Sequence, residues 1–257
     1  MLTLRNVSAG YDGVPVVHEV AFELRAGDRL ALIGPNGCGK TTLLRAIAGV
    51  LPYTGEIAVH GRPLSDLKRR ERAGKIAMLS QVSGLYFAYS VFDTVMMGRY
   101  AHAAGGLLAL PTEADREKAL ACLEAVDLLS LRDRPITTLS GGQLQRVFLA
   151  RTLAQEPEII LLDEPTNHLD LRYQIELMEY LQRWVAEGDR AIIGAIHDVN
   201  LGIHFCDKVL VMADGRVRAM GDTREVLTAD LLVETYGAPV VAYMRESLGA
   251  WEKMRDC

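Results

Sequence analysis

The chain has 257 residues, of which 49% are hydrophobic and 24% are charged, and its formal net charge is −5. This balance excludes a disordered or fibrous chain and leaves no broad positive field to hold nucleic acid, so we expect no nucleic-acid partner. The cysteines, at positions 38, 122, 206 and 257, are too widely spaced for a metal knuckle and fit a reducing compartment.

The first sixty residues predict mainly strands. Apolar runs separated by glycines indicate strands at 2–7, 20–24, 29–33 and 56–59. One helix is expected to interrupt these strands, beginning at residues 39–41. The N-terminal part of the chain therefore predicts a β-rich subdomain.

The segment between the third strand and this helix fits the pattern GxxxxGK[ST], and it reads Gly34-Pro35-Asn36-Gly37-Cys38-Gly39-Lys40-Thr41. Glycines let the backbone N–H groups of such a loop turn toward phosphate oxygens, and the helix start adds positive potential. We expect Lys40 to neutralise the β- and γ-phosphates, Thr41 to hold Mg²⁺ and Thr42 to contact the α-phosphate side. The pattern predicts a nucleoside triphosphate site, but kinases, GTPases and transport ATPases share it.

A strand at 75–79 leads into a mostly helical stretch from about 90 to 155, within which 113–126 has apolar residues at helical spacing. The apolar stretch 76–98 is interrupted by polar residues, so we expect neither a membrane span nor a secretory leader. We interpret the chain as one domain, 1–257. Its core and antiparallel β subdomain comprise 1–82 and 156–257, and a helical subdomain of about 83–155 is inserted between them.

Two adjacent carboxylates end the next strand. The four aliphatic residues at 159–162 indicate a strand covered on both faces, and Asp163 and Glu164 follow it where a parallel sheet meets its ligand. Because one carboxylate suffices for the metal, we expect Asp163 to hold Mg²⁺ through water. Glu164 would then polarise the water that attacks the γ-phosphorus.

The remaining elements complete an α/β pattern. Helical periodicity over 171–185 and an apolar strand at 190–196 make a strand–helix–strand unit with 159–162. Asp214-Gly215 predicts a hairpin, and short helices are expected near residues 224 and 231.

The segment Leu139-Ser140-Gly141-Gly142-Gln143, followed by Leu144-Gln145-Arg146, resembles the signature motif of the ATP-binding-cassette (ABC) ATPases. Ser140 and the glycines would open a helix and form a second anion site. The resemblance implies a P-loop NTPase (RecA-like) core with an N-terminal antiparallel β subdomain and an inserted helical signature subdomain. It also implies a head-to-tail homodimer, in which the phosphate loop of one subunit and residues 140–143 of the other enclose the same ATP and Mg²⁺.

Other positions match the family one at a time. Tyr11 resembles the residue that stacks on adenine, and Gln81 resembles the glutamine that ligates Mg²⁺ and senses the membrane partner. His197 resembles the switch histidine that contacts the γ-phosphate and positions the attacking water. Asp170, in Asn167-His168-Leu169-Asp170, resembles the residue that contacts the other subunit and caps a helix. The resemblance thus assigns catalysis to Glu164, His197 and Gln81, and metal binding to Thr41, Gln81 and Asp163.

Cys38 departs from the family, which usually has Ser or Ala at this position. A thiol at a helix start beside Lys40 predicts that an alkylating reagent blocks ATP hydrolysis and that Mg-ATP protects the protein.

The type of transporter follows from other segments. Exporter ATPases are often fused to membrane helices, which are not expected here, so an importer is favoured. Segments 91–100, 169–174, 197–201 and 235–237 resemble those of ATPases for iron-siderophore, haem and cobalamin uptake. Zinc and manganese importers are the alternative, because they share segments 169–174 and 235–237. A soluble ABC ATPase acting on ribosomes, DNA or cofactor assembly is a further alternative.

The importer interpretation implies two further partners, which are separate integral-membrane permease subunits and an extracytoplasmic substrate-binding protein that acts indirectly. It places the chain peripherally on the cytoplasmic face of the inner membrane. The stretch 81–99, with Leu85, Tyr86, Phe87 and Tyr89, is a candidate dock for a cytoplasmic helix of the permease. The alternative for these side chains is that they fill the joint between subdomains.

Overall fold

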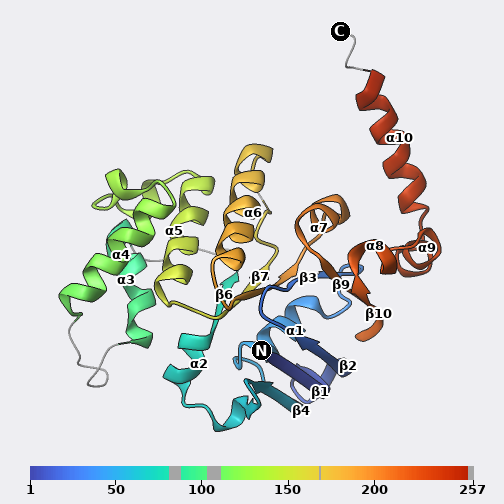
Figure 1. Ribbon diagram of the computed structural model, residues 1–257, viewed down its shortest axis with the longest axis horizontal. Helices are drawn as coiled ribbons and strands as arrows, with labels where there is room; N and C mark the ends of the chain where they lie inside the picture. Colours follow the sequence, from blue (N-terminus) through green and yellow to red (C-terminus); the bar gives the residue numbers. More distant parts are fainter. Residues whose placement is uncertain (81–87, 103–110, 168, 254–257) are drawn as a thin grey trace.

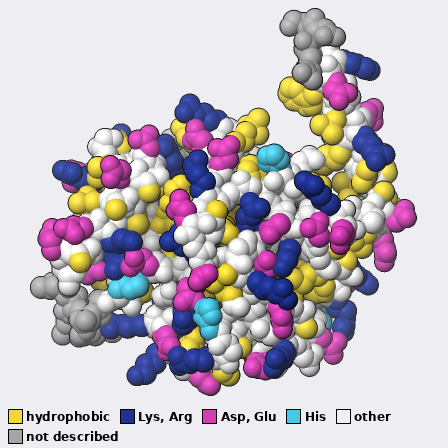
Figure 2. All heavy atoms as spheres, in the orientation of Figure 1, with side chains coloured by type: hydrophobic (Ala, Val, Ile, Leu, Met, Phe, Trp, Pro, Cys, Tyr) yellow, Lys and Arg dark blue, Asp and Glu magenta, His cyan; other side chains and the backbone are white. Residues whose placement is uncertain are grey.

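The computed structural model describes residues 1–80, 88–102, 111–167 and 169–253. Gln81, His168 and the candidate dock residues Leu85, Tyr86 and Phe87 lie outside the described residues. No helix in the described ranges combines the length and hydrophobicity needed to cross a bilayer. On the face shown in Figure 2, positive and negative side chains are interspersed rather than segregated by sign.

Two sheets form the body of the protein. A four-stranded antiparallel sheet has the order β2-β1-β4-β5, with β1 at Leu2–Tyr11, β2 at Val14–Leu24, β4 at Tyr53–Val59 and β5 at Arg62–Pro63. A six-stranded sheet has the order β10-β9-β3-β8-β7-β6. Its strands are β3 (Arg29–Ile33), β6 (Ile76–Ser80), β7 (Ile159–Asp163), β8 (Ala191–Ala195), β9 (Lys208–Ala213) and β10 (Arg216–Asp222). The second sheet is parallel except for β10, which pairs antiparallel with β9.

The helices surround these sheets (Figure 1). They are α1 (Lys40–Ile47), α2 (Arg69–Lys75), α3 (Val91–Met96), α4 (Glu113–Ala125), α5 (Gly141–Ala154), α6 (Leu171–Ala186), α7 (Val199–Phe205), α8 (Thr223–Val226), α9 (Ala229–Tyr236) and α10 (Val240–Lys253). Short 3₁₀ turns add η1 (Leu64–Asp66), η2 (Met97–Ala101), η3 (Leu129–Leu131) and η4 (Ile136–Thr138). In Figure 1, α3, α4 and α5 form a separate helical group beside the sheets, and α10 extends away from the body.

The six-stranded sheet has a hydrophobic core on each face, which explains the unbroken aliphatic run of β7. Ile160 and Leu162 belong to the core shared with α3, α4, α5 and α6, whereas Ile159 and Leu161 belong to the core shared with α1 and the antiparallel sheet. All four side chains are 0% exposed. The predicted strand with both faces covered is therefore confirmed.

Most predicted elements are confirmed, including β3, α6 and the hairpin at Asp214-Gly215. The first two strands are longer than predicted, and the first continues through Gly10 to Tyr11. A Cβ on Gly10 would lie 1.9 Å from the carbonyl oxygen of Val14, so glycine is needed there because the two strands approach closely at the turn. The helices α7 and α10 were not expected. The boundaries of the inserted subdomain, 83–155, stay a prediction, and α3, α4 and α5 fall within them.

Candidate functional site

A hollow of about 470 Å³ opens where β3, β7 and β8 end, which is where parallel sheets bind ligands. The residues that line it come from four separate parts of the chain, and they are Val16, Asn36, Gly37, Gly39, Lys40, Thr41, Thr42, Glu164, Asn167 and His197. The fold thus brings the predicted phosphate loop to the predicted catalytic carboxylate and histidine.

The phosphate loop joins β3 to α1 and wraps around its own lysine. A Cβ at Gly34 would lie 2.1 Å from the carbonyl oxygen of Met212 in β9, so only glycine fits this close approach. Lys40 is 6% exposed, and its Nζ donates to the carbonyl oxygens of Gly34 at 2.7 Å and Pro35 at 3.0 Å. The loop therefore places a positive charge at its centre, next to the free N–H groups of the helix start.

The predicted metal residues meet on the sheet side of this loop. Thr41 Oγ1 donates a 2.7 Å hydrogen bond to Asp163 Oδ1, and Asp163 is 8% exposed at the end of β7. Hydroxyl and carboxylate oxygens are ligands that Mg²⁺ prefers, and Mg²⁺ usually completes its shell with phosphate and water. Ser80, opposite Asp163 in the ladder, immediately precedes Gln81, the third predicted ligand.

The carboxylate of Glu164 is held from both sides. Its Oε1 contacts Nε2 of His197, just beyond β8, and its Oε2 accepts a hydrogen bond from Nδ2 of Asn167. Glu164 has a left-handed backbone with φ of 53°, and its N–H donates to the carbonyl oxygen of Ala195 at 3.2 Å. This turn directs the side chain into the hollow, where a carboxylate can accept a proton from water.

Asn167 and Val16 line the hollow, although sequence reasoning assigned neither of them to it. The N–H of Asn167 donates to the carbonyl oxygen of Glu164 at 3.3 Å, and this turn brings the Asn167 side chain back to the carboxylate. No pattern in the sequence points to Val16, which enters from β2 of the other sheet.

The signature segment forms a helix start, as predicted, but does not line the hollow. Ser140 Oγ accepts from the N–H of Gln143 at 3.3 Å, and the Gln143 side chain accepts from the N–H of Ser140 at 3.1 Å, which is a capping box at the start of α5. Ser140 and Gly141 are exposed. The two predicted anion sites are therefore separate within one chain.

The other predicted residues lie outside the lining of the hollow. Tyr11, at the end of β1, is 41% exposed, and its hydroxyl accepts a 2.9 Å hydrogen bond from Arg45. Asp170 caps α6 by accepting from the N–H of Tyr173 at 3.0 Å. Cys38 is only 5% exposed and packs in the core beneath the loop, so the structure leaves its thiol little open to a reagent, contrary to the expected sensitivity to alkylation.

Comparison with known proteins gives consistent matches. A family profile described as "ABC transporter" matches residues 17–167. A "Hemin import ATP-binding protein HmuV" of Streptomyces coelicolor is 43% identical over 239 residues, which is 93% of this chain and 84% of that protein. A "Cobalamin import ATP-binding protein BtuD" of Halobacterium salinarum is 36% identical over 93% of this chain and 59% of its own length. The dimeric ATP-binding cassette MJ0796, solved with ADP and phosphate, superposes with a TM-score of 0.76 at 29% identity, covering 87% of this chain and 99% of that one.

Proposed function

The chain belongs to the ABC transporter family, and on that premise we propose that it is the Mg-ATP-hydrolysing subunit of an importer for haem, an iron chelate or cobalamin. The main observation behind this proposal is that the phosphate loop, Glu164 and His197 line the same hollow. The relatives named for hemin and cobalamin import support the choice of cargo class.

In the proposed reaction, Lys40 exchanges the two loop carbonyl groups that it now contacts for the β- and γ-phosphate oxygens of ATP. This exchange is favourable because the ammonium group then faces negatively charged phosphate oxygens in place of neutral carbonyl groups. The oxygens of Thr41 and Asp163 suit Mg²⁺, with Gln81 as the further proposed ligand, and the ion would neutralise charge on the phosphates.

We assign the proton transfer to Glu164. Its carboxylate accepts the proton of the water that attacks the γ-phosphorus, and contacts from His197 and Asn167 hold it in the required orientation. His197 also lies at the edge of the hollow, where it can donate to the γ-phosphate. In this scheme water is the nucleophile, and the side chains of the protein position that water.

The exposed Ser140 at the start of α5 supports the proposed head-to-tail homodimer, because this anion site lies outside the hollow of its own chain. A second subunit would supply its residues 140–143 to the bound ATP, and Asp170 would contact the neighbour. Hydrolysis then reopens the pair, and this movement would drive separate permease subunits at the cytoplasmic face of the membrane.

The function is tested with the membrane complex. We expect the tagged chain to copurify with a polytopic permease after gentle solubilisation of membranes. In liposomes, the ATPase rate should rise when the cognate binding protein carries haem, a ferric chelate or cobalamin. Stimulation by zinc or manganese alone would reassign the cargo, and recovery of soluble partners alone would overturn the transport function.

The catalytic assignment is tested separately. Glu164→Gln should lower kcat by about 10²–10⁴-fold while ATP still binds, so a closed dimer should accumulate in gel filtration. The matched control is Glu179→Gln, on the exposed face of α6, which should hydrolyse ATP at the wild-type rate. Wild-type turnover by Glu164→Gln would remove the proposed base.

A further inference from the structure

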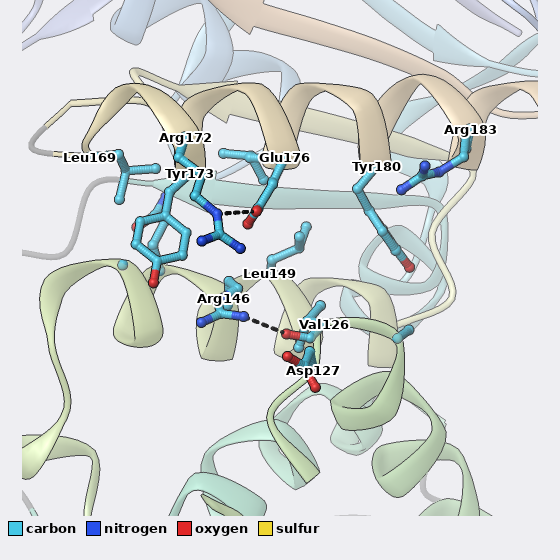
Figure 3. A pocket seen from close by; sticks show the side chains of 14 residues that line it. Val126, Asp127, Arg146, Leu149, Leu169, Arg172, Tyr173, Glu176, Tyr180 and Arg183 are labelled. Atoms are coloured by element: carbon cyan, nitrogen blue, oxygen red, sulfur yellow. Dashed lines mark hydrogen bonds and ion pairs between the residues drawn. The ribbon is translucent and has the colours of Figure 1, made fainter. Parts of the chain in front are cut away.

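A second hollow, of about 420 Å³, separates the middle of α5 from α6 (Figure 3). Its walls include Leu149 from α5, Leu177 and Tyr180 from α6, and Val126 just after α4. The hollow lies between these parts of the two helices, so contacts at the start of α5 help to set their relative position.

One such contact is made by Tyr173, in the first turn of α6. Its ring points from α6 toward the start of α5 (Figure 3) and covers Gly142 so closely that an added Cβ would lie 3.0 Å from Cδ2 and 3.1 Å from Cε2. A larger residue at this position would crowd the ring and require Tyr173 to shift by a few tenths of an ångström. The φ of Gly142 is not in the left-handed region, so backbone conformation is not the obstacle to a larger residue.

Arg146 completes the contact from one turn further along α5. Its guanidinium carbon lies 5.2 Å from the centre of the Tyr173 ring, within the range of a cation–π interaction. Its Nη1 donates to the carbonyl oxygen of Val126 at 3.2 Å, whereas its Nε is buried without a hydrogen-bond acceptor. The ring is consequently a favourable electrostatic neighbour for a guanidinium whose hydrogen bonding is incomplete.

The start of α5 also contacts the turn that follows Glu164. Gln145 Nε2, on α5, donates to the carbonyl oxygen of Pro165 at 3.2 Å. The N–H of Tyr173 donates to the capping Asp170, and Gln174 Nε2 donates to the carbonyl oxygen of Leu169 at 3.0 Å. The start of α5 is therefore hydrogen-bonded to Pro165, and the first turn of α6 is hydrogen-bonded to Leu169 and Asp170.

We propose that Tyr173 is a positioning residue that fixes the signature segment relative to the turn of Glu164. This inference rests on the proposed function, in which residues 140–143 serve the ATP of the neighbouring subunit and Glu164 serves the ATP of its own. The Tyr173 ring then links the two ATP sites through one chain, because a shift of residues 140–143 would be passed on to the turn after Glu164.

The experiment compares Tyr173→Ala with Tyr173→Phe, which keeps the ring, and with Tyr180→Ala, which removes a tyrosine from the same helix and hollow. Tyr173→Ala should lower kcat about tenfold, the effect of losing a contact of this size. Tyr173→Phe should stay within about twofold of wild type, because the ring contact remains. Affinity of the monomer for a fluorescent ATP analogue should be unchanged in all three variants, because the phosphate loop of the same chain lies elsewhere.

A second measurement does not depend on catalysis. Amide hydrogen exchange of residues 141–146 should become faster in Tyr173→Ala and stay at the wild-type rate in Tyr180→Ala. Equal protection of this segment in wild type and Tyr173→Ala would overturn the positioning role, as would an equal loss of kcat in the two alanine variants. A wild-type protein without ATPase activity would instead refute the proposed function, and the exchange result would still stand.

Discussion

Arg99 lies in η2, the 3₁₀ turn that follows α3. Loss of its side chain is expected to be among the substitutions that reduce the stability of the protein most. Its side chain is 11% exposed, and it joins three elements. Its Nε lies 2.9 Å from Oδ1 of Asp115 in α4, and its Nη1 lies 2.7 Å from both Oε2 of Glu156 and the carbonyl oxygen of Ala154 at the end of α5. The position of α5, which begins with the signature segment, thus depends partly on this guanidinium.

Arg99→Ala leaves the Asp115 carboxylate, only 9% exposed, without its cation. Breaking a buried ion pair on one side costs about 3–5 kcal/mol, and we expect the lower value because Glu156 keeps Lys118 as a partner. For a chain of this size, a loss of about 3 kcal/mol lowers Tm by roughly 6–12 °C. Differential scanning calorimetry at pH 7 measures this shift. The matched control is Arg132→Ala, which removes a pair with side-chain exposures of 52% and 88% and should change stability by less than about 0.5 kcal/mol.

The pH dependence gives a second check on the same pair. Hydrogen bonds from the hydroxyl and N–H of Thr112, and then from Arg99, lower the pKa of Asp115 from 3.8 to about 2. Since the folded-state pKa is the lower one, the stabilisation is complete above about pH 4 and is lost as the pH falls toward 2. The difference between wild type and Arg99→Ala should therefore shrink below pH 4. Equal Tm losses for the Arg99 and Arg132 variants, or a difference that grows in acid, would refute the reasoning.

Three further predictions concern other parts of the chain. Gly98→Ala should destabilise the protein by about 1–3 kcal/mol in urea denaturation, because the added Cβ would lie 2.3 Å from a backbone carbonyl oxygen of α5. Gly74→Ala, with nothing within 4 Å, should be neutral or slightly stabilising, and equal effects would contradict the packing argument. Burial raises the pKa of Cys122 to about 11 and of Cys206 to about 12, so Ellman's reagent at pH 8 should label neither thiol until denaturant is added. Rapid labelling of either of these two thiols in the native protein, located by peptide mass spectrometry, would contradict this. Lys40→Ala should weaken binding of a fluorescent ATP analogue at least about tenfold, and an unchanged affinity would disprove its role.

The sequence predicted those elements whose periodicity reports directly on their surroundings. The aliphatic run of β7 could be assigned because alternate residues enter two different cores, which leaves no polar position. The helix α10 was not predicted, although its apolar residues Val240, Met244, Leu248 and Trp251 recur at helical spacing. No residue of α10 is buried, so these apolar side chains do not join either hydrophobic core. A short helix that lacks such packing is hard to distinguish from irregular structure by its sequence alone.

For the candidate site, residues within one continuous pattern were predictable and those that depend on backbone direction were not. The phosphate loop carries its chemistry in its own spacing, so Lys40 and Thr41 could be placed in advance. The contact of Asn167 with Glu164 depends on a positive φ that only the folded turn reveals. The contact of Tyr173 with Gly142 joins α6 to α5, and no local pattern connects these segments.

The helical insert is attached to the sheet at two separated points. β6 and β7 are neighbouring parallel strands, with Ile76 opposite Ile159 and Ser80 opposite Asp163. The chain leaves this strand pair after Ser80 and returns to it at Ile159, so the two attachment points lie at opposite ends of the pair, offset by roughly 13 Å along the strands at about 3.3 Å per residue. The chain between these strands is therefore attached to the sheet at two points that are offset along the strand direction, rather than at one.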